Sequence, residues 1–219
     1  MASRFLFEQN LSELKTAIIQ MGEDVGKAIK LSVQSLNQAD RELAQSVIQN
    51  DIVINSMEEK IDQIGTRLIA TQQPVAKDLR RILIAFKIAA DLERMGDLAV
   101  DIANVTIRIG DSGLVKPLVN ISKMADLAQQ MTDESILSFT QENIDLAYKT
   151  ASLDDEVDEL HSHNMREIFA LIANDPERIN RAMLLAFVSR YLERIADHAT
   201  NIGESVVYLV KGKRPDLNR

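Results

Sequence analysis

Residues 91–101 read DLERMGDLAVD, and one hundred residues later positions 191–201 read YLERIADHATN. Both segments contain Leu-Glu-Arg-x-x-Asp-x-Ala, so the second is a recognisable copy of the first. In each copy a Glu, an Asp and a third residue with a side-chain oxygen follow one another at intervals of four. Residues at this interval lie along one stripe of an α-helix, each about 40° round from the last. The sequence therefore predicts two equivalent helices that each carry a line of oxygen atoms.

Apolar residues recur at spacings of three and four on both sides of these segments, which is typical of helices with one buried face. Helix breakers are scarce, with eight glycines and four prolines in 219 residues, so the helices should be few and long. Capping and turn residues predict helix boundaries near Asp40, Pro74, Gly110, Pro117, Asn143, Pro176 and Gly212. At the start of the last helix we expect Asp175 as the cap and Pro176 at the first helical position. The predicted fold class is all-α, with six long helices.

The two halves of the chain resemble each other beyond the repeated motif. Ala44 recurs as Ala147 and Asp51 recurs as Asp154, both at a spacing of 103 residues. Each half contains three predicted helices with short connections, which indicates two tandem antiparallel three-helix bundles. We assign residues 5–112 to the first repeat, 113–212 to the second and 213–219 to a flexible tail.

The composition excludes several classes of function. A formal net charge of −8 leaves no basic surplus to neutralise the phosphates of a nucleic acid. Because the chain has no cysteine, it has no disulfide, thiolate metal site or catalytic thiol. No apolar run approaches the roughly 20 residues that span a bilayer, and the N-terminus lacks the apolar core of a secretory signal. We therefore expect a cytoplasmic protein that neither binds nucleic acid nor inserts into a membrane.

The predicted hairpins bring oxygen-bearing side chains from two helices to the same level. If the helices before and after Pro74 are antiparallel, Asp51 lies opposite Asp97, and the same geometry applies around Pro176. The facing pairs predicted in the two hairpins are Asp51 with Asp97, Asn55 with Glu93, Asp154 with Asp197, and Asp158 with Glu193. Both repeats therefore give the same register, and in both the acids should line a groove beside the core.

Clustered carboxylate and amide oxygens, with no cysteine and little histidine, suit hard or borderline cations such as Mg²⁺, Ca²⁺, Mn²⁺ or iron. His161 and His198 adjoin the second cluster and could bias it towards a transition metal, although each could equally be a solvated or hydrogen-bonded side chain. The alternative for the acids is a solvated helix face, in which Arg94 and Arg194 pair with carboxylates of their own helix.

The Leu-Glu-Arg-x-x-Asp signature, present on the third helix of each repeat, resembles that of the PhoU family of bacterial phosphate-uptake regulators. The resemblance extends from about Phe5 to Gly212. It implies two similar three-helix bundles packed side by side, usually in a homodimer, with iron, zinc, magnesium or manganese ions held by the acidic motifs. The metal ligands that it implies are Glu93, Asp97, Asp101, Asp51 and Asn55 in the first repeat and Glu193, Asp197, Asn201, Asp154 and Asp158 in the second. Because Asn55 and Asn201 are neutral, equal occupancy of the two sites is not expected.

The resemblance implies a regulatory function. PhoU-like proteins restrain phosphate uptake and the phosphate-starvation response through contacts with the ATPase subunit of the phosphate ABC transporter and with a membrane sensor histidine kinase. The residues themselves do not indicate an enzyme, since the chain has no Ser-His-Asp spacing, phosphate-binding glycine loop or cysteine nucleophile. Two alternatives are a metal-free helical adaptor whose acidic grooves bind basic surfaces, and a ferritin-like di-iron protein, for which the Glu-x-x-His motifs are missing.

Overall fold

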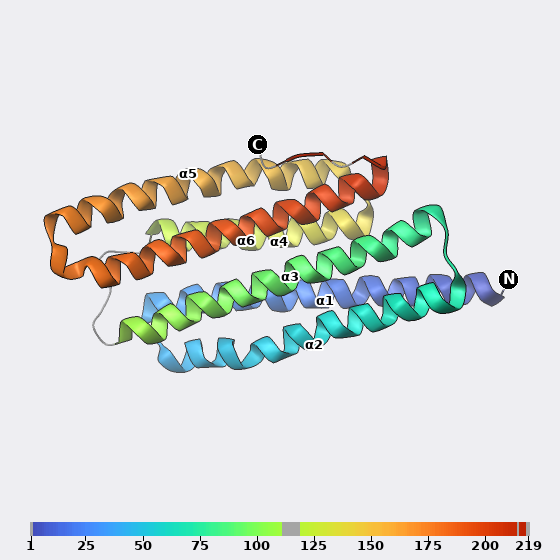
Figure 1. Cartoon of the computed structure of the whole chain (residues 1–219), viewed down its shortest axis with the longest axis horizontal. Helices are drawn as coiled ribbons and strands as arrows, with labels where there is room; N and C mark the ends of the chain where they lie inside the picture. Colours follow the sequence, from blue (N-terminus) through green and yellow to red (C-terminus); the bar gives the residue numbers. More distant parts are fainter. Residues whose placement is uncertain (1, 111–118, 214, 218–219) are drawn as a thin grey trace.

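The computed structural model describes residues 2–110, 119–213 and 215–217, and within these ranges the chain forms six long α-helices (Figure 1). They are α1 (Ala2–Gln38), α2 (Arg41–Gln72), α3 (Ala76–Ile109), α4 (Val119–Gln141), α5 (Ile144–Asn174) and α6 (Ile179–Lys211). A 3-10 turn, η2 (Pro176–Arg178), precedes α6. The predicted all-α fold is confirmed. None of the helices in these ranges is long and apolar enough to cross a membrane.

Most helix ends follow the capping residues that the sequence predicts. The Asp40 carboxylate accepts a hydrogen bond of 2.9 Å from the amide of Leu43, and so caps α2. Asn143 caps α5 in the same way. Gly110 and Gly212 follow the last residues of α3 and α6 with positive φ angles of 58° and 72°, which glycine adopts without steric cost. Pro117 lies outside the described residues.

The predicted start of the last helix is wrong. Pro176 belongs to the short turn η2, α6 begins at Ile179, and Asp175 does not cap it. Asp175 instead ends α5, because its amide donates to the carbonyl of Leu171 at 3.0 Å. Its carboxylate is taken up by an ion pair with Arg178, at 2.6 Å from Nε to Oδ2, and so does not serve as the helix cap.

The helices form two three-helix groups that lie side by side (Figure 1). In each group the helices are consecutive in sequence, so α1, α2 and α3 make the first repeat and α4, α5 and α6 the second. The third helices of the two repeats, α3 and α6, pack directly against each other, and α1 also contacts α4. Two tandem antiparallel three-helix bundles were predicted, and this arrangement is observed. The predicted boundary between residues 112 and 113 falls outside the described ranges.

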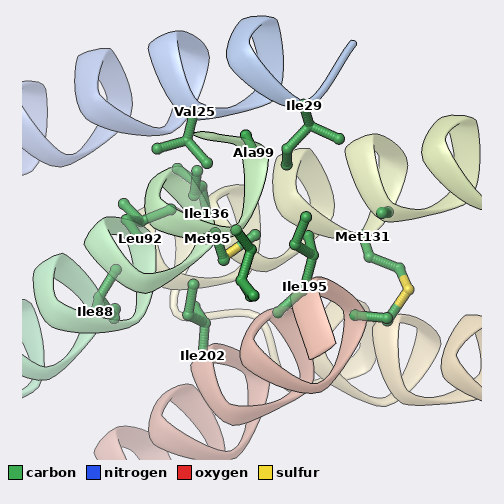
Figure 2. Packing of buried hydrophobic residues seen from close by; sticks show 14 of the residues in the cluster. Val25, Ile29, Ile88, Leu92, Met95, Ala99, Met131, Ile136, Ile195 and Ile202 are labelled. Carbon is green, nitrogen blue, oxygen red and sulfur yellow. The ribbon is translucent and has the colours of Figure 1, made fainter. Parts of the chain in front are cut away.

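One large hydrophobic core runs through both repeats (Figure 2), and a small second cluster is formed by Ala44, Val47 and Ala103. Val25 of α1, Met95 of α3, Met131 of α4 and Ile195 of α6 all contribute to the large core, and each is completely buried. Burial of apolar surface is the main favourable contribution to folding. Because one core holds α1, α3, α4 and α6 together, the positions of the two motif-bearing helices are fixed relative to each other.

Polar contacts also join the two repeats at the start of α3. The Glu142 carboxylate, in the turn between α4 and α5, accepts from Arg81 Nε at 2.6 Å and pairs with Lys77 Nζ at 2.7 Å. Burial alone would raise the pKa of Glu142, but the hydrogen bonds from Arg81 and Lys77 outweigh it and hold the pKa below its usual value. These contacts fix the beginning of α3 against the second repeat.

We predict that Leu92→Ala destabilises the whole chain by about 2–5 kcal/mol, because it leaves a cavity in the shared core. Leu92 is 0% exposed, whereas Leu83 on the same helix is 50% exposed. The control Leu83→Ala should therefore change stability by only about 0.5 kcal/mol or less. Urea unfolding followed by circular dichroism measures both effects. Two separate transitions, of which Leu92→Ala moves only one, would show that the repeats unfold independently and contradict a common core.

Candidate functional site

The first acidic groove lies between α2 and α3, where Asp51 approaches the backbone beside Asp97. Asp51 Oδ1 stands 3.6 Å from the position that a β-carbon on Gly96 would occupy. The absence of a side chain at Gly96 therefore lets the carboxylate lie close against α3. Asn55 Nδ2 donates a hydrogen bond of 3.1 Å to Asp51 Oδ2 and orients the carboxylate.

The carboxylates of this groove repel one another. Burial and then the negative charge of Asp97 raise the pKa of Asp51 above its usual value. The same two causes, in the same order, raise the pKa of Glu93 and of Asp101. The structure therefore brings together the predicted residues of α2 and α3, with Asp101 at the exposed end of the line.

Arg94 supplies a positive charge to the first groove. Its guanidinium lies 3.3 Å from Glu93 Oε2 and 3.2 Å from Asp97 Oδ2. The Arg94 side chain is 62% exposed, so these ion pairs are well solvated and each is worth only about 0.2–1 kcal/mol. A competing cation could displace Arg94 at little cost.

The second groove, between α5 and α6, is the more buried of the two. Asp154 is only 7% exposed, and burial followed by the charges of Asp197 and Asp158 raises its pKa to about 7. Burial and then the charge of Asp197 raise the pKa of Glu193 to about 7 as well, although Arg190 forms an ion pair with it and opposes the rise. These four acids come together as the register predicted.

Asn201 lies half-buried on α6, one turn beyond Asp197. Its backbone carbonyl accepts a hydrogen bond of 2.9 Å from Ser205. In the first repeat the equivalent residue is Asp101, so the second groove has a neutral oxygen where the first has a carboxylate.

The two histidines near the second groove have different surroundings. His198 Nδ1 donates across the repeat boundary to Asp91 Oδ1 of α3, at 3.0 Å, so this nitrogen is directed away from the groove. His161 remains beside Asp158 and places its Nδ1 3.0 Å from the Ser189 hydroxyl. Burial and the charge of Arg190 lower the pKa of His161, which favours the neutral imidazole.

Sequence reasoning missed the part-buried hydrogen bond between His198 and Asp91. Asp91 stands just before the repeated motif, at a core position between the buried residues Ile88 and Met95. A carboxylate at the spacing of an apolar stripe is a signal that it has a buried partner. Its partner, one hundred and seven residues away, could not be identified from the sequence.

Several buried oxygens in the two grooves have no hydrogen-bond partner among the described residues. They are Asp51 Oδ1, Asn55 Oδ1, Asp154 Oδ1 and Glu193 Oε2. Buried polar atoms are nearly always paired with protein groups, water or ions, so these acceptors could bind a cation, although Asp91 Oδ2, Glu134 Oε2 and Asn164 Oδ1 are also unpaired among the described residues. The donor chemistry also fits a hard or borderline metal ion.

The side chains are not arranged as a finished metal site. In the part of the chain that the structure describes, no group of three or more His, Asp and Glu side chains is placed to hold a metal ion as it stands. The ion pairs of Arg94 and Arg190 draw carboxylates towards the guanidinium groups. Binding of a metal would therefore require these side chains to rotate, with the helices remaining in place.

Comparison with known proteins finds the same architecture and similar sequences over nearly the whole chain. The family model described as PhoU domain matches residues 18–106 and 121–206. The chain is 37% identical over 217 residues, 99% of either sequence, to a phosphate-specific transport system accessory protein PhoU homolog of Clostridium acetobutylicum. It is similar to the crystal structure of PhoU from Pseudomonas aeruginosa, with a TM-score of 0.90 and 36% identity over 94% of this chain and 100% of that one. It is also similar to a phosphate transport system regulatory protein PhoU from Streptococcus pneumoniae, with a TM-score of 0.89, 28% identity, and coverage of 96% and 99%.

We predict that Asp154→Asn stabilises the metal-free chain at alkaline pH. Because the pKa of this carboxyl rises from 3.8 to about 7 on folding, the folded state binds the proton more tightly, and the stability from this proton is lost as pH rises through that interval. Asparagine does not ionise, so at pH 8 the variant should gain roughly 1–4 kcal/mol over the parent, and near pH 4 little. Urea unfolding in a chelator at each pH measures the difference. The exposed neighbour Asp155→Asn is the control, and a parallel pH profile for Asp154→Asn and the parent would refute the prediction.

Proposed function

The chain belongs to the PhoU family, and we propose that it is a negative regulator of phosphate uptake whose two acidic grooves bind metal ions. Its relatives are accessory proteins of phosphate-specific transport, which supports a regulatory role in that system. The observation that carries the metal proposal is the recurrence of buried, unpaired oxygens in equivalent grooves of both repeats.

In the first repeat the proposed ligands are Glu93, Asp97 and Asp101 of α3 with Asp51 and Asn55 of α2. In the second they are Glu193, Asp197 and Asn201 of α6 with Asp154 and Asp158 of α5. A bound divalent cation would supply positive charge between the two helices of a hairpin. The candidates by donor chemistry are magnesium, manganese, iron and zinc. These side chains would hold the cation, and its positive charge would offset the repulsion between their carboxylates.

We propose that the regulator works in the cytoplasm as a homodimer. Its proposed partners are the ATPase subunit of the phosphate ABC transporter and the sensor histidine kinase of the phosphate-starvation response. Family membership supports these partners. The proposal assigns the chain no catalytic activity: the acidic grooves offer charge and ligands, and the Ser189 hydroxyl beside His161 is 0% exposed.

A metal-free adaptor is the second candidate function. The ion pairs of Arg94 and Arg190 favour it, since they partly neutralise the grooves without any metal. In this case the remaining negative charge would bind basic side chains of a partner directly. The two candidates differ in whether partner binding depends on a metal ion.

For the metal proposal, we predict that full-length, metal-stripped protein binds Mn²⁺ at two loci per chain, and that Glu93→Ala with Glu193→Ala weakens binding at both. Each substitution takes away a carboxylate, so affinity should fall roughly tenfold or more at each locus. Isothermal titration calorimetry and elemental analysis measure this. The matched control is Glu59→Ala with Glu159→Ala, two exposed acids on the partner helices. Equal binding by the double variant and its control would refute the ligand assignment.

For the regulatory role, we predict that binding to the transporter's ATPase subunit is stronger with Mn²⁺ than in a chelator. Neutralised grooves present a different surface charge to the partner, and interfaces are sensitive to such charge changes. Co-purification of the ATPase subunit with the full-length chain, under both conditions, measures the effect. Binding that is unchanged by chelation but lost in Glu93→Ala with Glu193→Ala would favour the metal-free adaptor instead.

A further inference from the structure

The second groove carries a histidine where the first carries a carboxylate. At the repeat spacing of 103 residues, His161 of α5 is equivalent to Glu58 of α2. His161 follows Asp158 by three residues, so the two side chains lie on the same face of the helix. The charge of Asp158 acts on the imidazole, which places the two groups near each other. An acid and a histidine at this spacing are also a metal-binding pattern in helical bundles.

The imidazole of His161 is held by a buried hydroxyl on α6, and Asn164 of its own helix supports that hydroxyl. Its Nδ1 lies 3.0 Å from Ser189 Oγ of α6, and Asn164 Nδ2 donates to the same hydroxyl at 3.2 Å. The Ser189 hydroxyl can donate its own proton to Met124 Sδ, 3.6 Å away, and accept from both the amide and the imidazole. The network thus accommodates a proton on His161 Nδ1, which leaves the lone pair on Nε2, as in a metal-bound histidine.

The first repeat lacks this support. Ala89 stands at the position of Ser189, and Ile61 stands at the position of Asn164. Ser189 and Asn164 are both 0% exposed, and burying polar side chains is unfavourable unless they are hydrogen-bonded. The histidine and its two supporting residues thus differ together from the first repeat, which indicates that the second repeat is built to orient an imidazole.

Unpaired oxygens lie in the same groove. Asp154, 7% exposed, has a buried Oδ1 without a well-formed hydrogen bond among the described residues, although the nearby Thr200 side chain acts to lower its pKa, and Glu193 Oε2 is likewise unpaired. The negative charges that act most strongly on Asp154 are those of Asp197 and Asp158, so its carboxylate faces the acids next to His161. The second groove therefore combines unpaired carboxylate oxygens with an imidazole whose orientation is fixed.

We propose, on the basis of the metal-binding function proposed above, that His161 Nε2 is a ligand of the metal ion in the second groove. Ser189 positions the imidazole. The two grooves then differ in metal preference. The first groove, with oxygen donors alone, favours hard ions such as Mg²⁺ and Mn²⁺. The second, with an imidazole beside its carboxylates, favours borderline ions such as Zn²⁺ and Co²⁺.

The test compares the full-length chain with three single variants: His161→Gln, Ser189→Ala and, as the matched control, His163→Gln. His163 is exposed on the same helix and pairs with Glu167 at 3.3 Å. Zn²⁺ and Mn²⁺ affinities are measured by calorimetry, and the visible absorption of bound Co²⁺ reports a nitrogen ligand. His161→Gln should lose roughly tenfold or more in Zn²⁺ affinity and change the Co²⁺ spectrum, with Mn²⁺ binding at the first groove unchanged.

Ser189→Ala keeps the imidazole and removes its hydrogen-bond partner. It should lower the ratio of Zn²⁺ to Mn²⁺ affinity by roughly tenfold, a change that a purely structural role in the metal-free fold would not produce. If His161→Gln leaves the Zn²⁺ affinity and the Co²⁺ spectrum unchanged, the inference is overturned. If that variant does not fold, an unchanged ratio of Zn²⁺ to Mn²⁺ affinity in Ser189→Ala overturns it. A parent chain that binds no metal at either groove overturns the proposed function itself.

Discussion

Carboxylates held opposite one another on packed antiparallel helices repel, and the rest of the structure prevents them from separating. Asp51 and Asp97, and Asp154 and Asp197, stand on helices whose opposite sides belong to one continuous core. Moving these helices apart would expose apolar side chains to water, and the burial of those side chains therefore keeps the carboxylates close together. The repulsion is therefore relieved locally. The raised pKa of Asp154 makes its carboxylate easier to protonate, and arginine side chains pair with the neighbouring acids.

The two grooves are not electrostatically independent. Arg194 of α6 opposes the rise in pKa of Asp101, which belongs to α3 and to the other repeat, as well as that of Glu193 on its own helix. Arg94 pairs with Glu93 and Asp97 inside the first repeat. Because Asn201 replaces the carboxylate of Asp101 in the second repeat, the near-symmetry of the backbone carries an asymmetric distribution of charge. A cation bound in one groove would alter the field in the other, since a single guanidinium acts on both.

Most of the fold could be predicted because it depends on local regularities. Helical periodicity and the caps at Asp40 and Asn143 define the helices. The antiparallel register about each hairpin tip gives the facing of Asp51 with Asp97 and of Asp154 with Asp197. The start of α6 could not be predicted, because an ion pair of Asp175 with Arg178 competes with capping. The bond between Asp91 and His198 was also beyond sequence reasoning, because it joins side chains from different repeats. The periodicity of a helix shows which side chains share a face, but the rotamers that bring donor atoms together depend on neighbouring charges.

Under the proposed function, the fixed core determines what kind of signal a metal ion can give. The core holds α3 and α6 in place, so a bound cation changes side-chain positions and charge more than backbone shape. The carboxylates that Arg94 and Arg190 now neutralise would turn to the metal, and these two arginines, 62% and 52% exposed, would be released towards solvent. A surface with carboxylates and arginines in pairs would become one with free guanidinium groups beside a neutralised groove. A partner that recognises this surface by charge complementarity would then distinguish the two states without any rearrangement of the helices.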